Sequence, residues 1–138
     1  MVRTAGIELK TKGNADVNDI TQQVKEAIRE SDIQDGVVTI FTPSSTSGLT
    51  TIEFESGAIS DFQRLFDEII NPKRNYAHNA RWGDGNGHSH IRASLLGPSI
   101  SVPFKNKNLM LGTWQQIIFV DFDIRSRQRH IVLQMVGE

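Results

Sequence analysis

The sequence contains no cysteine, which excludes disulfide bonds, iron–sulfur clusters and thiolate zinc sites. Any metal ion must therefore be held by histidine, carboxylate, hydroxyl or carbonyl groups, or by water. The sequence also lacks an apolar run near the roughly 18 residues of a membrane span, and residues 1–10 lack an apolar signal segment. We therefore predict a cytoplasmic protein that has no membrane partner.

The sequence also has no excess of charge of one sign. Its 15 Lys and Arg residues nearly balance its 16 Asp and Glu residues, and the formal net charge is −1. Because no overall field favours nucleic acid or an anionic surface, we expect neither as a partner. A hydrophobic fraction of 38% is typical of a globular chain, and 138 residues suffice for one domain with its own core.

Three of the four histidines gather in one glycine-rich window, at His78, His88 and His90. Glycines at 83, 85 and 87 interrupt any regular element there, so a loop that folds back would bring the three imidazoles together. Imidazole is the commonest transition-metal ligand and the usual proton carrier near neutral pH. His88 and His90 would share a face of a strand, whereas on a helix they would point apart. The alternative is a surface loop with incidental histidines.

The rest of the chain predicts an α+β fold with largely antiparallel or mixed sheets. Apolar residues recur at helical spacing over 20–28 and 59–70, which predicts two main helices, the first capped by Asn18 or Asp16. Since helices and strands do not alternate strictly, we expect a single domain over residues 1–138 rather than a parallel βαβ fold. Runs of β-branched or alternating residues predict strands over 2–10, 37–41, 49–55, 99–104, 109–123 and 130–136.

Two further segments offer side chains for a site. Hydroxyl and amide groups at Ser44, Ser45 and Thr46, just after a predicted strand, could hold an anion or a water molecule, and the alternative is an ordinary turn. Glu53 lies on the next predicted strand and is a candidate base or ligand, although such a carboxylate is more often solvated. Trp114 is a candidate pocket residue whose alternative is a core or interface role.

Four motifs of this chain occur together in one family. They are TPSSTSGLT with Glu53 from residue 42, YAHN from residue 76, HSHIRASLLGPS from residue 88 and LGTWQQI from residue 111. In this combination the chain resembles the YjbQ-like proteins, an uncharacterised family also named secondary thiamine-phosphate synthases. The resemblance runs from about residue 5 to the C-terminus. It implies an α+β, YjbQ-like domain that forms homotrimers with sites near the subunit boundaries.

The resemblance also implies a metal site and an activity. Family members are often described with a metal ion held by histidines, which points to His78 and His90, with His88 as a further candidate. Many relatives have a histidine where this chain has Ser44, so water or a hydroxyl group would complete the site here. The implied reaction joins a hydroxymethylpyrimidine diphosphate to a thiazole phosphate, as a main or a side activity.

Such a transferase must hold small anionic, phosphorylated substrates and stabilise the leaving diphosphate. We expect Glu53, Asn79 and Arg92 to take part in catalysis and Arg81 to bind phosphate. The choice of Arg92 requires an extended segment in which it shares a face with His90, and a helix would instead favour Arg81.

The predicted cofactor is a divalent ion, because histidine ligands favour Zn²⁺ and a diphosphate favours Mg²⁺. One alternative function is metal-dependent hydrolysis with Glu53 or Asp84 as the base. Another is a non-enzymatic, trimeric module that binds a metal ion or a small anion. His130 lies in the final predicted strand, and we interpret it as structural.

Overall fold

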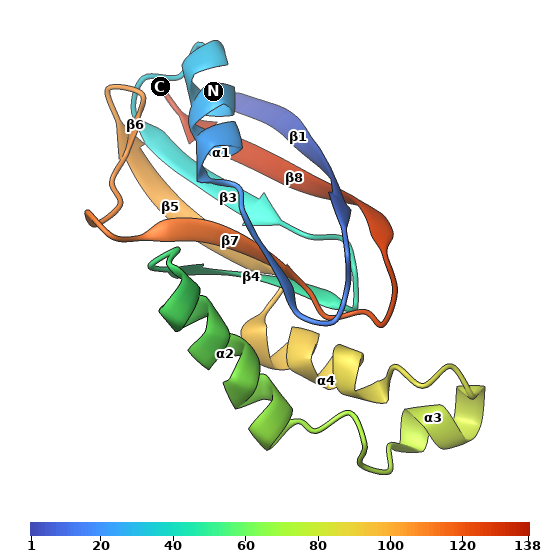
Figure 1. Ribbon diagram of the computed structural model, residues 1–138. Coiled ribbons are helices and arrows are strands. Elements are labelled where there is room, and N and C mark those ends of the chain that lie inside the picture. The colour runs from blue at the N-terminus through green and yellow to red at the C-terminus, as the bar shows by residue number, and fades with distance from the viewer.

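The structure, a computed structural model, describes residues 1–138 and contains two antiparallel sheets and four helices, of which the first lies apart from the other three (Figure 1). The five-stranded sheet has the order β1-β8-β3-β5-β6. Its strands are Val2–Thr11, Arg127–Gly137, Gly36–Phe41, Ser99–Lys105 and Asn108–Leu109. The three-stranded sheet has the order β2-β7-β4, with strands Asp16–Asp19, Gln116–Asp121 and Ser47–Ile52. The helices α1 to α4 are Thr21–Glu30, Ser56–Ile69, Ala77–Trp82 and Gly87–Leu96.

Strand β7 separates two hydrophobic cores. Ile117 and Phe119 belong to the larger core, which lies between the two sheets and against α1. Ile118 and Val120 belong to the smaller core, which the three-stranded sheet shares with α2 and α4. Successive side chains of a strand point to opposite faces, so a strand covered on both sides has to be continuously apolar. The run IIFV in this strand follows that rule.

Helix α1 confirms the predicted amphipathic stripe, because Ile20, Val24 and Ile28 are completely buried. The predicted caps are wrong. Asn18 and Asp16 lie in β2, which pairs with β7, and the Asp19 carboxylate instead accepts hydrogen bonds from the backbone N–H and the hydroxyl of Thr21 at 3.0 and 2.6 Å.

The second predicted helix is confirmed, but it begins at Ser56. The Glu55 side chain accepts hydrogen bonds from the backbone N–H groups of Gly57 and Ala58 and so caps this helix. Strand β4 ends at Ile52 and does not reach Glu55 as predicted, because Ile52 pairs with Gln116, the first residue of its partner strand β7.

Two further predictions fail, each in a segment that contains glycine. The predicted strand over 109–123 is interrupted, since β7 begins at Gln116 and the backbone N–H of Gly112 donates to the Gln115 side chain at 2.8 Å in an irregular loop. The histidine window forms α3 and α4, which the sequence pattern did not predict. No helix of the structure combines the length and the apolarity that crossing a membrane requires.

Candidate polar cleft

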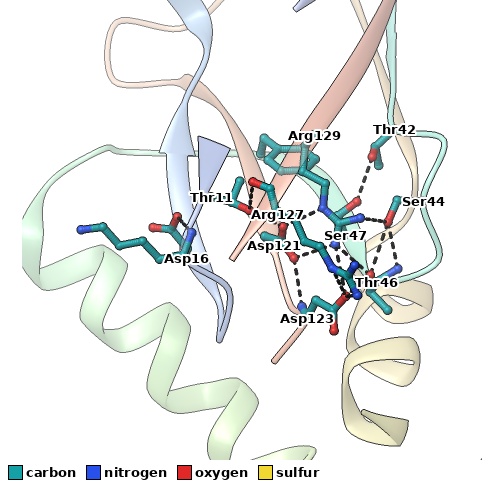
Figure 2. Close-up of polar contacts among 12 residues, drawn as sticks. Thr11, Asp16, Thr42, Ser44, Thr46, Ser47, Asp121, Asp123, Arg127 and Arg129 are labelled. Carbon is teal, nitrogen blue, oxygen red and sulfur yellow. Dashed lines mark hydrogen bonds and ion pairs between the residues drawn. The ribbon is translucent and has the colours of Figure 1, made fainter. Parts of the chain in front are cut away.

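A polar cleft of about 540 Å³ lies where three parts of the chain meet. One wall is the segment 43–46 between β3 and β4. A second wall comes from α3, the turn that follows it and α4. Asp123, Arg127 and Arg129, after β7 and at the start of β8, complete the lining. Figure 2 shows the arginines and Asp123 turned toward the hydroxyl side chains of the first wall.

His78 on α3 and His90 on α4 lie next to each other in this cleft. Their ring centroids are 4.4 Å apart. The two short helices approach closely because Gly87 starts α4, and a Cβ at this position would lie 2.5 Å from the Cβ of Tyr76. The Gly87 N–H also donates to Asn79 Oδ1 at 2.9 Å. Glycine at position 87 is therefore what allows the two imidazoles to meet.

Asp84 and Asn86, in the turn between α3 and α4, surround Nε2 of His78. Asp84 Oδ1 lies 3.1 Å from this nitrogen. In the orientation of the Asn86 carboxamide that satisfies its neighbours, the side-chain NH₂ group donates to His78 Nε2 at 2.9 Å and to Asp84 Oδ1 at 3.0 Å. In that arrangement Nε2 accepts, so the neutral imidazole carries its proton on Nδ1. After protonation the same nitrogen has the Asp84 carboxylate as an ion-pair partner.

A buried ion pair fixes the hydroxyl wall of the cleft. Arg129, whose side chain is 14% exposed, binds the fully buried Asp121 through two hydrogen bonds of 2.7 and 2.9 Å (Figure 2). The same guanidinium donates to Ser44 Oγ at 3.0 Å and to Thr46 Oγ1 at 2.9 Å. The hydrogen bond to Asp121 raises the pKa of Arg129, so the guanidinium stays charged. Thr11 adds a 2.6 Å hydrogen bond to the Asp121 carboxylate.

Asp123 and Arg127 form a second pair at the edge of this network. The Asp123 carboxylate accepts from Arg127 Nε at 2.9 Å. Burial acts to raise the pKa of Asp123, but the Ile124 N–H and the Arg127 guanidinium outweigh burial and hold this pKa below its usual value. The Arg127 side chain is 38% exposed, so it keeps a surface toward the cleft while the donors of Arg129 are bound to protein groups.

The comparisons with known proteins agree on one family. The family described as UPF0047 protein YjbQ-like matches residues 5–138 of the sequence. The chain belongs to the YjbQ-like family. The UPF0047 protein of Archaeoglobus fulgidus is 35% identical over 126 residues, which are 91% of this chain and 96% of the relative. That of Methanothermobacter thermautotrophicus is 36% identical over 137 residues, 99% of this chain and 94% of the relative.

Solved structures of YjbQ-like proteins have the same fold. A YbjQ-like protein of unknown function from Sulfolobus solfataricus P2 is similar with a TM-score of 0.94 and 33% identity, over 100% of this chain and 99% of that one. A YjbQ/UPF0047 family protein from Clostridium acetobutylicum is similar with a TM-score of 0.88 and 34% identity, over 96% of this chain and 99% of that one. These descriptions name a family and no reaction.

In this YjbQ-like chain the helical alternative holds for the second histidine motif. His88 turns away from the cleft and is 6% exposed, with its ring centroid 6.2 Å from that of Tyr76. Burial, followed by the charge of Arg92, lowers the pKa of His88. Its Nδ1 has no hydrogen-bond partner. Because residues 88 and 90 of a helix point apart, His90 alone of this pair reaches His78.

The extended interpretation that favoured Arg92 is wrong for the same reason. Arg92 is 3% exposed and donates to the backbone carbonyl of Ile70 at 2.9 and 3.2 Å and to Asp67 at 3.0 Å. It therefore ties α4 to the end of α2. Arg81, the alternative to Arg92, does not line the cleft. Its guanidinium carbon lies 5.5 Å from the centroid of the Trp82 ring.

The remaining predicted residues separate into those inside and those outside the cleft. Ser44, Ser45 and Thr46 line it. Glu53 and Trp114 line a different cavity. Asn79 holds Gly87, as described above. His130 is exposed on β8, where it pairs with Glu8.

Sequence reasoning missed the acidic and basic pairs of the network. A signal was present, because DFD at 121–123 and RQR at 127–129 each place two like charges on one face of an extended chain. It also assigned no role to Trp82 or Asn86, which line the cleft. No group of three or more histidine or carboxylate side chains is arranged to hold a metal ion.

Proposed function

We propose that this YjbQ-like protein binds a small phosphorylated substrate in the cleft and transfers the group that carries the phosphate. The observation that carries the proposal is the meeting of two imidazoles, a hydroxyl segment and a half-exposed arginine in one cleft. Coupling of hydroxymethylpyrimidine diphosphate to a thiazole phosphate is the reaction to test, in line with the resemblance to thiamine-phosphate synthases. Whether it is the main activity or a side activity is part of that test.

Phosphate recognition falls to the hydroxyl groups of Ser44 and Ser45 and to Arg127. Arg129 has a different role, since four of its five N–H donors already bind Asp121 and the hydroxyl wall. It fixes the positions of Ser44 and Thr46 before a substrate arrives. Such preorganisation lowers the cost of ordering the site on binding.

In the coupling, the bond between the pyrimidine methylene carbon and the diphosphate oxygen breaks, and its electron pair leaves with the diphosphate. The lone pair of the thiazole nitrogen forms the new carbon–nitrogen bond. His78, protonated and paired with Asp84, gives its proton to the departing diphosphate. His90 lies beside it and contributes a second imidazole to the same wall.

A divalent ion belongs to the proposal as a cofactor. Because a protonated His78 cannot bind a metal ion, His90 and Asp84, completed by water, are the donors that the cleft leaves for the ion, and an imidazole with a carboxylate suits a transition metal by chemistry. The ion would neutralise charge on the diphosphate. We assign no step of the reaction to it, because no three histidine or carboxylate side chains surround a common point.

The test is product formation from the two precursors, with Mg²⁺ or Zn²⁺ supplied. Loss of a positioned acid typically lowers a rate by about a hundredfold or more, so we expect His78→Ala to lose at least that factor. The matched control is His130→Ala, which removes an imidazole from the exposed face of β8. If wild type makes no product with either ion, the transferase proposal fails. If His78→Ala is as active as His130→Ala, the role of His78 as the acid fails.

Metal-assisted hydrolysis is the second candidate, and the contacts of His78 favour it. A neutral His78 next to Asp84 would take a proton from water at Nε2 once that water displaces the Asn86 carboxamide from this nitrogen. Turnover of a generic phosphoester that chelation abolishes would support this candidate. Binding of phosphate without turnover would leave the non-enzymatic metal- or anion-binding module.

We also propose that copies of the chain assemble as a homotrimer. Large apolar side chains are exposed on two surfaces: Ile91 and Leu95 on α4, and Val2, Val37 and Val136, which are cross-strand neighbours on the outer face of the five-stranded sheet. Exposed apolar surface of this kind marks interaction sites. Light scattering at micromolar concentration should give the mass of three chains, and a stable monomer would rule the trimer out.

A further inference from the structure

Trp82 differs from every other side chain of the cleft. It is the one large apolar residue in a lining that otherwise consists of charged and polar groups and Pro43. It is also 66% exposed. Tryptophan is a large, flat and electron-rich surface, and an exposed one beside a polar cleft leaves that surface available to a ligand. Phosphate binding alone gives no role to an exposed indole at this position.

The backbone around Trp82 is held firmly. Trp82 is the last residue of α3, and Gly83 ends the helix in the left-handed conformation with φ 72°, where its N–H donates to the Asn79 carbonyl at 2.8 Å. A glycine is favoured at such a helix end. Asn79 in turn holds the start of α4 through Gly87. The indole is therefore carried by the same helix pair that sets His78 against His90.

One side of the indole already has a partner. The guanidinium carbon of Arg81 lies over the ring, 5.5 Å from its centroid, and Arg81 is not part of the cleft lining. The contact supports the ring from outside the cleft by a cation–π interaction. The rest of the exposed indole, which borders the cleft, remains for a ligand whose flat face would stack on it.

We propose that Trp82 is the specificity-determining wall of the cleft and stacks against a planar heteroaromatic ring of the substrate. This inference rests on the proposed function, in which the hydroxyl segment and Arg127 bind phosphate. It adds that the phosphate is carried by a flat ring, so that the substrate spans from the hydroxyl wall to the indole. The cleft volume of about 540 Å³ is in the usual range for small-molecule sites.

The chain is well suited to an optical test, because it contains two tryptophans and the second, Trp114, lines a different cavity. In Trp114→Phe, Trp82 is the sole indole and its fluorescence reports on the cleft. We expect hydroxymethylpyrimidine diphosphate to quench it with saturation. Inorganic diphosphate, which has no ring, should bind more weakly and leave the emission nearly unchanged.

Calorimetry on variants of the full chain separates the ring from the phosphate. Stacking of a ring on an aromatic side chain commonly changes affinity by about tenfold or more. Trp82→Ala should therefore weaken binding of hydroxymethylpyrimidine diphosphate about tenfold and leave the affinity for inorganic diphosphate unchanged. Trp82→Phe, which keeps a flat ring, should restore most of the loss.

The possible outcomes distinguish this inference from the proposed function. If inorganic diphosphate binds to wild type as tightly as the pyrimidine diphosphate does, the phosphate site stands and the role of Trp82 is refuted. Equal weakening of both probes by Trp82→Ala would also refute it, because a stacking wall acts on the ring alone. If neither probe binds wild type, the phosphate site and the role of Trp82 both fail. Saturable binding of the ring-bearing probe without catalysis would sustain the role of Trp82 and leave the transferase proposal unsupported.

Discussion

Replacement of Asp121 by asparagine would remove one charge from an ion pair that is almost completely buried. The variant keeps the size of the side chain, but Arg129 loses its bidentate carboxylate partner. The nearest remaining carboxylate is Asp123, 3.7 Å from Arg129 Nη2 and already bound to Arg127. The guanidinium would stay charged inside the protein without adequate compensation.

The expected loss in the free energy of unfolding follows from the burial of the pair. Removal of one partner of a buried pair typically costs about 3–5 kcal/mol. Because Asp123 compensates in part, we expect a loss near the lower end, about 3 kcal/mol in the free energy of unfolding. For a chain of this length that loss lowers the unfolding midpoint by roughly 10 °C.

Thermal and urea unfolding of wild type and Asp121→Asn measure this loss. Asp32→Asn is the matched control, because Asp32 pairs with Arg3 in a bridge in which both side chains are about half exposed, and exposed bridges contribute little. Its midpoint should stay close to that of wild type. Equal midpoints for wild type and Asp121→Asn would show that the pair does not anchor the hydroxyl wall.

The other expected outcomes concern the helix pair and the histidines. Gly87→Ala should lower stability by more than about 1 kcal/mol and weaken substrate binding, since its Cβ would meet Tyr76; wild-type values would refute the close packing. Burial depresses the pKa of His88 in the folded state, so wild-type stability should fall as the pH drops below the unfolded value of about 6.5. His88→Leu should flatten that dependence, which urea titrations between pH 5 and 8 can test. Elemental analysis should find less bound metal in His90→Ala than in His130→Ala, and equal contents would argue against the metal.

Much of the fold can be predicted from local patterns because packing and pattern agree there. The stripe of Ile20, Val24 and Ile28 predicts α1, and the apolar run in 109–123 predicts a strand, which the structure covers on both faces. Element ends are less predictable. Asp19 binds the first residue of α1 and Glu55 caps α2, and nothing in the local spacing distinguishes them from the neighbouring acidic residues.

The cleft can be predicted only in part. Clustering of His78 and His90 is visible in the sequence, but the direction of each imidazole depends on whether residues 87–96 form a helix. The glycines at 83, 85 and 87 argue against a helix there, so the sequence pattern does not predict it. The partners of Arg129 come from two segments, one that ends β7 and one that lies more than 80 residues earlier in the sequence, so only the folded chain brings them together. Neither the ARWGDG context of Trp82 nor the GTWQQI context of Trp114 indicates which cavity each side chain lines, and tertiary packing assigns them to different cavities.

The position of β8 in the five-stranded sheet has a consequence for how the protein reaches its native state. This strand lies between β1 and β3, yet it follows both of them in the sequence. Until it inserts, those two strands have no common partner, and Arg129, which β8 carries, cannot reach the hydroxyl wall. Pairings over such separations form slowly. The cleft should therefore be among the last parts to become ordered, and a substrate would bind only chains that have completed this central pairing.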